Sequence, residues 1–197
     1  MQRKKAHFEG REPFLEKILS EFRFGKIIKH IPQKAKVLDL GCGFNGNFLQ
    51  KIRKESGEKS PENYFGLDIS VNPNMENIKL IKHNLNNPIP FEDKSFDVVT
   101  SLANLEHLEN PEFVLEEIYR VLKPKGILLL TAPSVYGKPV LEFLSFRLGL
   151  ISRNEIEDHK NYFDRESLLK LLKVTGFSSV DHKYFQIFMN NFARAKK

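Results

Sequence analysis

The sequence predicts an α/β fold built on one doubly wound, mostly parallel sheet. Short apolar runs that suit buried strands alternate along the chain with stretches of helical periodicity, which is the pattern of βαβ units. The first run leads directly into a loop with three glycines, residues 41–46, and open α/β sheets bind ligands at this end of a strand. The predicted parallel strands are residues 37–40, 64–68, 78–82, 96–101 and 127–131.

Periodicity and helix-end signals place the other elements. Apolar residues at i, i+3, i+4 and i+7 predict a helix over residues 12–30, with Gly25 as a point of interruption. Asn110 followed by Pro111 is a helix start, because it joins a side-chain cap to a proline at the first helical position. We expect that helix to end at Leu122, where residues 123–126 stop it. The remaining elements are a helix after the glycine loop that ends near residues 56–57, a helix from Asp164 to Gly176, and two final strands over 177–181 and 184–192.

Length and composition describe an ordinary globular chain. Its 197 residues predict one domain, 1–197, divided into an N-terminal helical segment (1–34), a cofactor-binding core (35–134), a variable segment (135–163) and a C-terminal helix and hairpin (164–197). The single cysteine, Cys42, excludes an intrachain disulfide. No apolar run approaches the roughly 18 residues of a membrane span, and no apolar stretch follows the basic N-terminus. We therefore expect a cytoplasmic protein without a transmembrane segment.

The net charge of +6 does not identify a partner. It comes from 31 basic and 25 acidic residues, and part of the excess lies at the two ends of the chain. Nucleic-acid binders concentrate positive charge on one face, whereas acidic residues are mixed throughout this sequence. A nucleic-acid partner is therefore not expected. The sequence does not determine an oligomeric state.

The glycine pattern has two interpretations from its residues alone. Gly41, Gly43 and Gly46 match G-x-G-x-x-G, which occurs in dinucleotide sites and also in tight turns without a ligand. Asp68 ends the second strand, 22 residues beyond Gly46, near the spacing at which an acid accepts the ribose hydroxyls of an adenosine. The turn residues that follow also allow Asp68 to be a helix cap. A dinucleotide-dependent reductase is therefore one alternative.

Four motifs in order give the chain a family resemblance. They are VLDLGCG, YFGLDIS, NLNNPIPFEDKSFDVV and NLEHLENPEFVLEEIYRVLKPKGILLLTAPS, which together cover about residues 35–134. The series resembles a class I S-adenosylmethionine-dependent methyltransferase. It is most similar to the small-molecule branch that contains the ubiquinone and menaquinone methyltransferase type of domain. The resemblance implies a Rossmann-like seven-stranded fold with an antiparallel C-terminal hairpin, and S-adenosyl-L-methionine as cofactor.

The resemblance also implies roles for individual residues. Asp39 would hold the methionine ammonium group, Asp68 the ribose hydroxyls, and Ile69 one face of the adenine. Asn84 stands where the family usually has an acid at the adenine edge, and the glycine loop is one residue wider than usual. Residues 101–104 would line the wall near the sulfonium. The predicted cofactor-binding residues are Asp39, Gly41, Cys42, Gly43, Asp68, Ile69, Asn84, Leu85 and Ser101.

The sequence says less about the methyl acceptor and the residues that would bind it. A base is needed only if the nucleophile carries a proton, and His107 and His159 are the candidate catalytic residues. We assign no metal ligands. Residues 140–150 are markedly apolar and predict a core helix, a lid over an apolar substrate, or an amphipathic surface. We expect a small or lipid-like acceptor with an anionic or hydroxylated head, methylated on oxygen or nitrogen and guided by Lys138 or Arg147. A non-catalytic partner subunit with this fold is the second alternative.

Overall fold

The computed structural model describes residues 14–57 and 61–197 and contains a seven-stranded sheet in the order β3-β2-β1-β4-β5-β7-β6. The first five strands are parallel neighbours, and β7 runs antiparallel to both β5 and β6. This arrangement is the mostly parallel sheet with an antiparallel C-terminal hairpin that the sequence predicts. The strands are β1 (Val37–Leu40), β2 (Tyr64–Asp68), β3 (Lys79–Lys82), β4 (Phe96–Leu102), β5 (Leu122–Pro133), β6 (Ser179–Phe185) and β7 (Asn190–Lys196).

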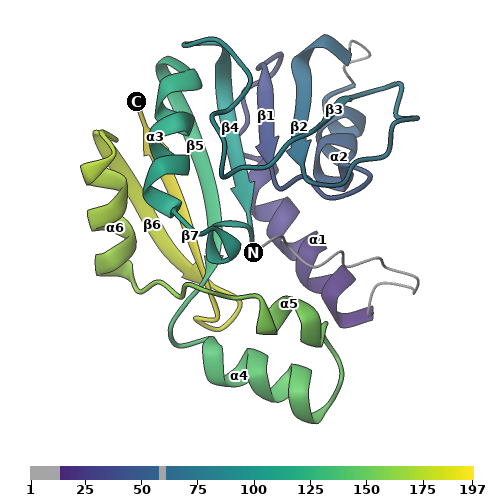
Figure 1. Ribbon diagram of the computed structural model, residues 1–197, viewed down its shortest axis with the longest axis vertical. Coiled ribbons are helices and arrows are strands. Elements are labelled where there is room, and N and C mark those ends of the chain that lie inside the picture. Colours follow the sequence, from purple (N-terminus) through teal and green to yellow (C-terminus); the bar gives the residue numbers. More distant parts are fainter. Residues whose placement is uncertain (1–13, 58–60) are drawn as a thin grey trace.

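Helices cover both faces of the sheet (Figure 1). On one face, α1 (Phe14–Ile28) and α2 (Asn47–Ser56) pack with alternate strand residues such as Val37 and Leu129. On the other face, α3 (Pro111–Val121) and α6 (Arg165–Val174) pack with the intervening residues, such as Leu38 and Leu128. Because successive side chains of a strand point to opposite faces, the near-continuous apolar strands supply two cores at once.

The predicted caps of α3 and α6 are present. The Asn110 side chain accepts a hydrogen bond from the Phe113 backbone N–H at 3.1 Å, with Pro111 at the first helical position. Asp164 and Ser167 form a reciprocal capping box at the start of α6. Such caps satisfy backbone N–H groups that have no partner inside the helix.

Two sequence predictions, an interruption at Gly25 and a strand start at residue 127, are wrong. Gly25 lies inside α1 and does not interrupt it, because the packing of Ile27 and its neighbours fixes the helix there. The predicted start of this helix, at residue 12, lies outside the described residues. The strand β5 begins at Leu122, directly after α3, and not at residue 127. Leu122 pairs with Phe96, and pairing resumes at Ile127 opposite Val98, so residues 123–126 form an irregularity within the strand rather than a separate loop.

The turn between the last two strands also differs from the prediction. It occupies residues 186–189, whereas the sequence predicts it near residues 182–183. Gln186, Ile187 and Phe188 all have positive φ angles, a conformation that usually attracts glycine. No glycine or proline marks the turn, and pairing of the whole length of β6 with β7 determines its position.

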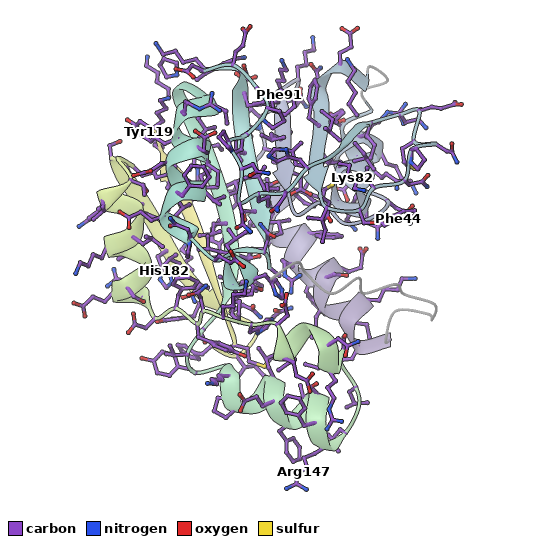
Figure 2. All side chains as sticks on the ribbon, in the orientation of Figure 1. Phe44, Lys82, Phe91, Tyr119, Arg147 and His182 are labelled. Carbon is purple, nitrogen blue, oxygen red and sulfur yellow. The ribbon has the colours of Figure 1, made fainter. Side chains whose placement is uncertain are left out.

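The variable segment lies beyond the carboxyl ends of the parallel strands (Figure 1). It contains α4 (Lys138–Glu142), a π-helical turn (Phe143–Arg147) and α5 (Arg153–Glu157). Phe143 is 55% exposed and Leu148 is 51% exposed, so the prediction of a core helix is wrong. Figure 2 shows Arg147 pointing outward at the end of the segment farthest from the sheet. Within the described residues, no helix combines the length and apolar character needed to cross a membrane.

Candidate active site

The glycine loop is tied to the end of the neighbouring strand. The backbone N–H groups of Gly41 and Cys42 both donate to the Leu67 carbonyl oxygen, at 2.8 and 3.2 Å. Gly41 and Gly43 have φ angles of 71° and 72°, which glycine adopts without strain. Apart from residues 42–44 themselves, no heavy atom of the described residues lies within 4 Å of the position that a Cβ on Gly43 would occupy. The loop therefore turns sharply and leaves open space beside Gly43.

Asp39 is a buried carboxylate directly before this loop. It is only 3% exposed and lies in register with Thr100 on β4, whose Oγ1 donates to Asp39 Oδ1 at 2.6 Å. Burial raises the pKa of Asp39 to about 7; the Thr100 hydrogen bond opposes this shift, and the charge of Asp68 adds to it. A cation beside Asp39 would stabilise its ionised form. No sequence pattern predicts this role for Thr100.

Asp68 ends β2 and contacts the glycine loop. Its Oδ2 accepts a hydrogen bond from the Gly43 N–H at 3.0 Å, and its Oδ1 accepts one from the Ser70 N–H at 3.2 Å. The described chain has no α-helix between β2 and β3, so the helix-cap interpretation of Asp68 is wrong. Each carboxylate oxygen can accept a further hydrogen bond, which leaves the ribose role open to Asp68.

The other predicted cofactor-binding residues differ in their burial. Ser101 and Leu85 are buried, Ile69 is half-buried and Asn84 is exposed. Asn84 Oδ1 accepts the Asn86 N–H at 3.0 Å, so its amide oxygen shapes the loop after β3.

Cys42 is buried in the glycine loop and packs against Gly66, where an added Cβ would lie 2.7 Å from its Sγ. Burial, followed by the nearby charges of Asp39 and Asp68, raises the pKa of the Cys42 thiol, so this cysteine is an inert packing residue.

Asn104 connects the glycine loop to the second half of the site. It is 3% exposed and its side chain lies against Gly41. Its backbone carbonyl accepts the His107 N–H at 3.1 Å, within the single 3₁₀ turn η2 (Leu105–His107) that follows β4. Residues 101–104, which the family resemblance implies near the sulfonium, therefore lead directly into the turn that carries His107, the first candidate catalytic histidine.

The two candidate catalytic histidines contact one another. The ring centroids of His107 and His159 are 4.9 Å apart in an edge-on arrangement. His107 Nδ1 lies 3.2 Å from Asp158 Oδ2, and His159 Nδ1 lies 3.0 Å from the Tyr162 hydroxyl. The residues come from η2 and from the end of the variable segment, so the fold joins parts that are distant in sequence.

Backbone hydrogen bonds hold these parts together. The N–H groups of Lys160 and Asn161 donate to the Glu106 carbonyl oxygen at 2.8 and 3.1 Å, and the Asn161 side chain donates to the Leu108 carbonyl oxygen. Glu106 itself is 1% exposed. Glu106 is not among the predicted site residues, although an adjacent glutamate and histidine before a capped helix is a signal that could have indicated it.

Burial shifts the pKa values of two side chains in this cluster, His159 and Tyr162. It lowers the pKa of His159 to about 4; the charge of His107 acts in the same direction, and Asp158 opposes the shift. Burial also raises the pKa of Tyr162 to about 12, with contributions from Glu142 and Glu106. At neutral pH the cluster therefore presents a neutral imidazole at His159 beside a protonated phenol.

Comparisons with known proteins agree with this architecture. Residues 8–182 match the family model described as a methyltransferase domain. A demethylmenaquinone methyltransferase of Staphylococcus carnosus is 27% identical over 179 residues, covering 79% of this chain and 73% of its own. A putative methyltransferase of Haloferax volcanii, solved in complex with the Trm112 activator, has a TM-score of 0.68 at 18% identity and covers 91% of this chain and 92% of its own. A SAM-dependent methyltransferase of Archaeoglobus fulgidus has a TM-score of 0.66 at 20% identity and covers 90% and 94%.

The sheet order, the glycine loop and its acids define an S-adenosylmethionine-dependent enzyme of class I. The chain belongs to the methyltransferase domain family. Its cofactor is S-adenosyl-L-methionine, a cation without phosphate groups, and the residues present fit that chemistry. A neighbouring positive charge would stabilise the ionised form of the buried Asp39 carboxylate. The open space at Gly43 gives a ligand access to the backbone. Nothing in the comparisons supports a dinucleotide-dependent reductase.

Proposed function

We propose that this enzyme methylates an oxygen or nitrogen atom of a small or lipid-like acceptor that binds beside His107 and His159, under the variable segment. The observation that carries the proposal is the contact between these two histidines, of which His107 follows Asn104, the residue that touches the glycine loop. Imidazole groups can accept a proton, and this contact supports a role for them next to the cofactor.

Each cofactor residue has a role in this proposal. Asp39 faces the ammonium group, and Gly41 and Gly43 let the amino-acid part lie against the backbone. Asp68 accepts from the ribose hydroxyls while it keeps the Gly43 N–H in place. Ile69, Asn84 and Leu85 frame the adenine, and Cys42 and Ser101 shape the wall behind it. When bound, the cofactor supplies a methyl group activated by the sulfonium.

The acceptor side then needs alignment and one proton acceptor. The nucleophilic oxygen or nitrogen forms a bond to the methyl carbon as the carbon–sulfur bond breaks, and a neutral thioether remains. His107 or His159 takes the proton of a hydroxyl or an ammonium group, and Asp158 orients His107 through the 3.2 Å contact. Most of the acceleration comes from positioning and from exclusion of water, because the displacement is in line.

The variable segment supports an apolar acceptor with a polar head. Several of its apolar side chains are exposed, among them Val140, Phe143 and Leu148, and exposed apolar patches are typical of binding sites. Lys138 Nζ lies 5.3 Å from the centroid of the Tyr162 ring, and Tyr162 contacts His159. Lys138 is thus placed to guide an anionic head, whereas Arg147 points away from the sheet (Figure 2). Of the two cations considered from the sequence, Lys138 is the one we propose.

The test is a product analysis with a panel of phenols, catechols, hydroxyquinones and amines that carry short or long alkyl chains. We expect S-adenosylhomocysteine to accumulate with at least one hydroxyl or amine acceptor, and mass spectrometry to locate the new methyl group on oxygen or nitrogen. The double variant His107→Asn with His159→Asn should bind S-adenosylhomocysteine normally but turn over slowly, and the single variants show which histidine takes the proton. A methyl group found on carbon, or wild-type turnover by the double variant, would overturn the proposal.

A further inference from the structure

Glu106, His107 and His159 form a cluster of metal-ligand type. Each offers one ligand atom, and the three atoms lie within 4.8 Å of one another. Glu106 and His107 are consecutive on η2, and His159 arrives from the end of the variable segment. Metal bonds to imidazole nitrogen and carboxylate oxygen are about 2.0–2.2 Å long, so modest side-chain rotations would close this set around an ion.

The charges in the cluster suit a cation. The Glu106 carboxylate is 1% exposed, and an ionised carboxylate at that depth is stabilised by a neighbouring positive charge. Imidazole nitrogen, offered here by His107 and His159, is a common metal ligand. Two nitrogens and one oxygen form a donor set for Zn²⁺, Mn²⁺ or Fe²⁺, whereas Mg²⁺ and Ca²⁺ prefer oxygen alone.

His107 also has the outer contacts that orient a metal ligand, and His159 contacts a hydroxyl group. His107 Nδ1 lies 3.2 Å from the Asp158 carboxylate and 3.4 Å from the Asp158 carbonyl oxygen. His159 Nδ1 lies 3.0 Å from the Tyr162 hydroxyl. In metal sites a ligating histidine donates its second N–H to a carboxylate or a carbonyl, which fixes its tautomer and directs the other nitrogen to the ion. His107 has this arrangement with both acceptor types.

From this geometry we propose that Glu106, His107 and His159 bind one divalent transition-metal ion, of the Zn²⁺ or Mn²⁺ class. Three protein ligands leave at least one position open on the ion, as in catalytic zinc sites. The position is available to an oxygen of the acceptor, and coordination makes a hydroxyl more acidic. In the metal-loaded enzyme both histidines are ligands, and the proton of a coordinated hydroxyl passes to water. Binding of the ion does not depend on the identity of the acceptor.

The test uses the full chain stripped with a chelator, without cofactor or acceptor. Calorimetry with Zn²⁺ should show one ion per chain, and Co²⁺ should give visible absorption bands from a nitrogen and oxygen ligand set. Glu106→Gln and His159→Asn remove ligands, and each should weaken Zn²⁺ binding by at least about 100-fold. Asp158→Asn should weaken it by about 10- to 100-fold, the usual effect of an outer-contact change. The matched control Glu116→Gln, on the exposed surface of α3, should bind like the wild type.

Absence of stoichiometric Zn²⁺ binding would overturn the inference, and so would equal affinity in the wild type and the ligand variants. If Glu106→Gln does not fold, His107→Asn and His159→Asn decide the question, because both histidines are half-buried. S-adenosylhomocysteine binding is measured on the same stripped protein. If the protein binds S-adenosylhomocysteine but no Zn²⁺, only the metal proposal is overturned. If it binds Zn²⁺ but transfers no methyl group to any acceptor of the panel, only the proposed function is overturned.

Discussion

Asn104 lies so close to Gly41 that a Cβ on residue 41 would come within 2.5 Å of the Asn104 Oδ1 atom. Gly41 also has a φ angle of 71°. The backbone of the glycine loop at Gly41 is therefore packed against the side chain of Asn104, which follows the end of β4. Gly43 has a nearly identical φ angle but open space at its Cβ position. The two glycines are thus needed for different reasons.

This contrast predicts different effects for Gly41→Ala and Gly43→Ala. Both place a Cβ at positive φ, which costs about 1–2 kcal/mol. Gly41→Ala also forces Asn104 to move, so urea denaturation should show the larger loss of stability. Gly43→Ala should remain well folded and lose mainly S-adenosylhomocysteine affinity, measured by calorimetry. The double variant Gly41→Ala with Asn104→Ala should recover part of the stability; no recovery would contradict the packing explanation.

Asp39 predicts an unusual dependence of stability on pH. Its pKa is about 7 in the folded protein and about 3.8 when exposed, so the folded state holds an extra proton between these values. Unfolding becomes easier as pH rises through this window, by up to a few kcal/mol from this group, and the loss is complete above about pH 7. Asp39→Asn does not titrate. The stability of the variant relative to the wild type should therefore increase from pH 4 to pH 7 and then level off.

The ionisation of Asp39, which lowers stability as pH rises, should strengthen ligand binding over the same pH range, and Asp39→Asn tests this. Attraction to the ammonium group needs the ionised carboxylate, so wild-type affinity for S-adenosylhomocysteine should rise as Asp39 ionises. Asp39→Asn should bind weakly at every pH. Calorimetry across pH 5.5–8 would check both curves, and parallel curves for the two proteins would assign the pH dependence to another group.

Asp68→Ala should weaken binding of S-adenosylhomocysteine by roughly 30- to 1000-fold, because each hydrogen bond to a charged group contributes about 1.5–3 kcal/mol. The variant also loses the acceptors of the Gly43 and Ser70 N–H groups, so urea denaturation is measured alongside calorimetry. Asp181→Ala, an exposed change on β6, is the control and should leave the affinity unchanged. Wild-type affinity in a folded Asp68→Ala protein would restrict Asp68 to holding the loop.

Arg120 is predicted to stabilise the loop before β4. It forms a bidentate pair with Glu117 at 2.7 and 2.8 Å and donates to the carbonyl oxygens of Ile89 and Phe91. Lysine cannot reproduce this planar set of donors, so Arg120→Lys should cost about 1–3 kcal/mol in urea denaturation. The exposed change Arg153→Lys is the control and should have little effect.

The pair also gives a pH test. Hydrogen bonding to Arg120 holds the pKa of Glu117 below its usual value of 4.5. The stability from the pair is therefore complete above that value and is lost as pH falls below it. Arg120→Lys should show a smaller loss on acidification than the wild type. An equal acid sensitivity would show that Glu117 does not contribute to it.

The sequence predicts the parallel part of the sheet well because buried strands and glycine loops have local signals. The strand ends of β1, β2 and β4 follow from apolar runs that stop at Leu40, at Asp68 and just before Asn104. The hairpin turn has no such signal, because Gln186, Ile187 and Phe188 adopt positive φ angles under the control of strand pairing. Tertiary pairing overrides local preference there.

Predictions at the candidate site divide in the same way. Asp39 and Asp68 stand at strand ends and could be selected by position, but the bond from Thr100 to Asp39 depends on the register of β1 against β4. His107 and His159 could be nominated by residue type alone. Their contact, and its proximity to the Glu106 carboxylate, arise from the path of the variable segment, which no local pattern specifies.

Lys138 and Arg147 provide a matched pair for testing the acceptor site. Both are exposed cations on the variable segment, but only Lys138 lies over the Tyr162 ring beside His159. Lys138→Ala should raise the KM for an anionic acceptor by about 5- to 20-fold, the loss expected for one partly solvated charge contact of about 1–2 kcal/mol. Arg147→Ala should leave that KM unchanged, because its side chain points outward (Figure 2). A neutral acceptor of the same length serves as the internal reference, since neither substitution should change its KM. If Arg147→Ala raises the KM and Lys138→Ala does not, the acceptor head lies at the outer end of the segment, away from the two histidines.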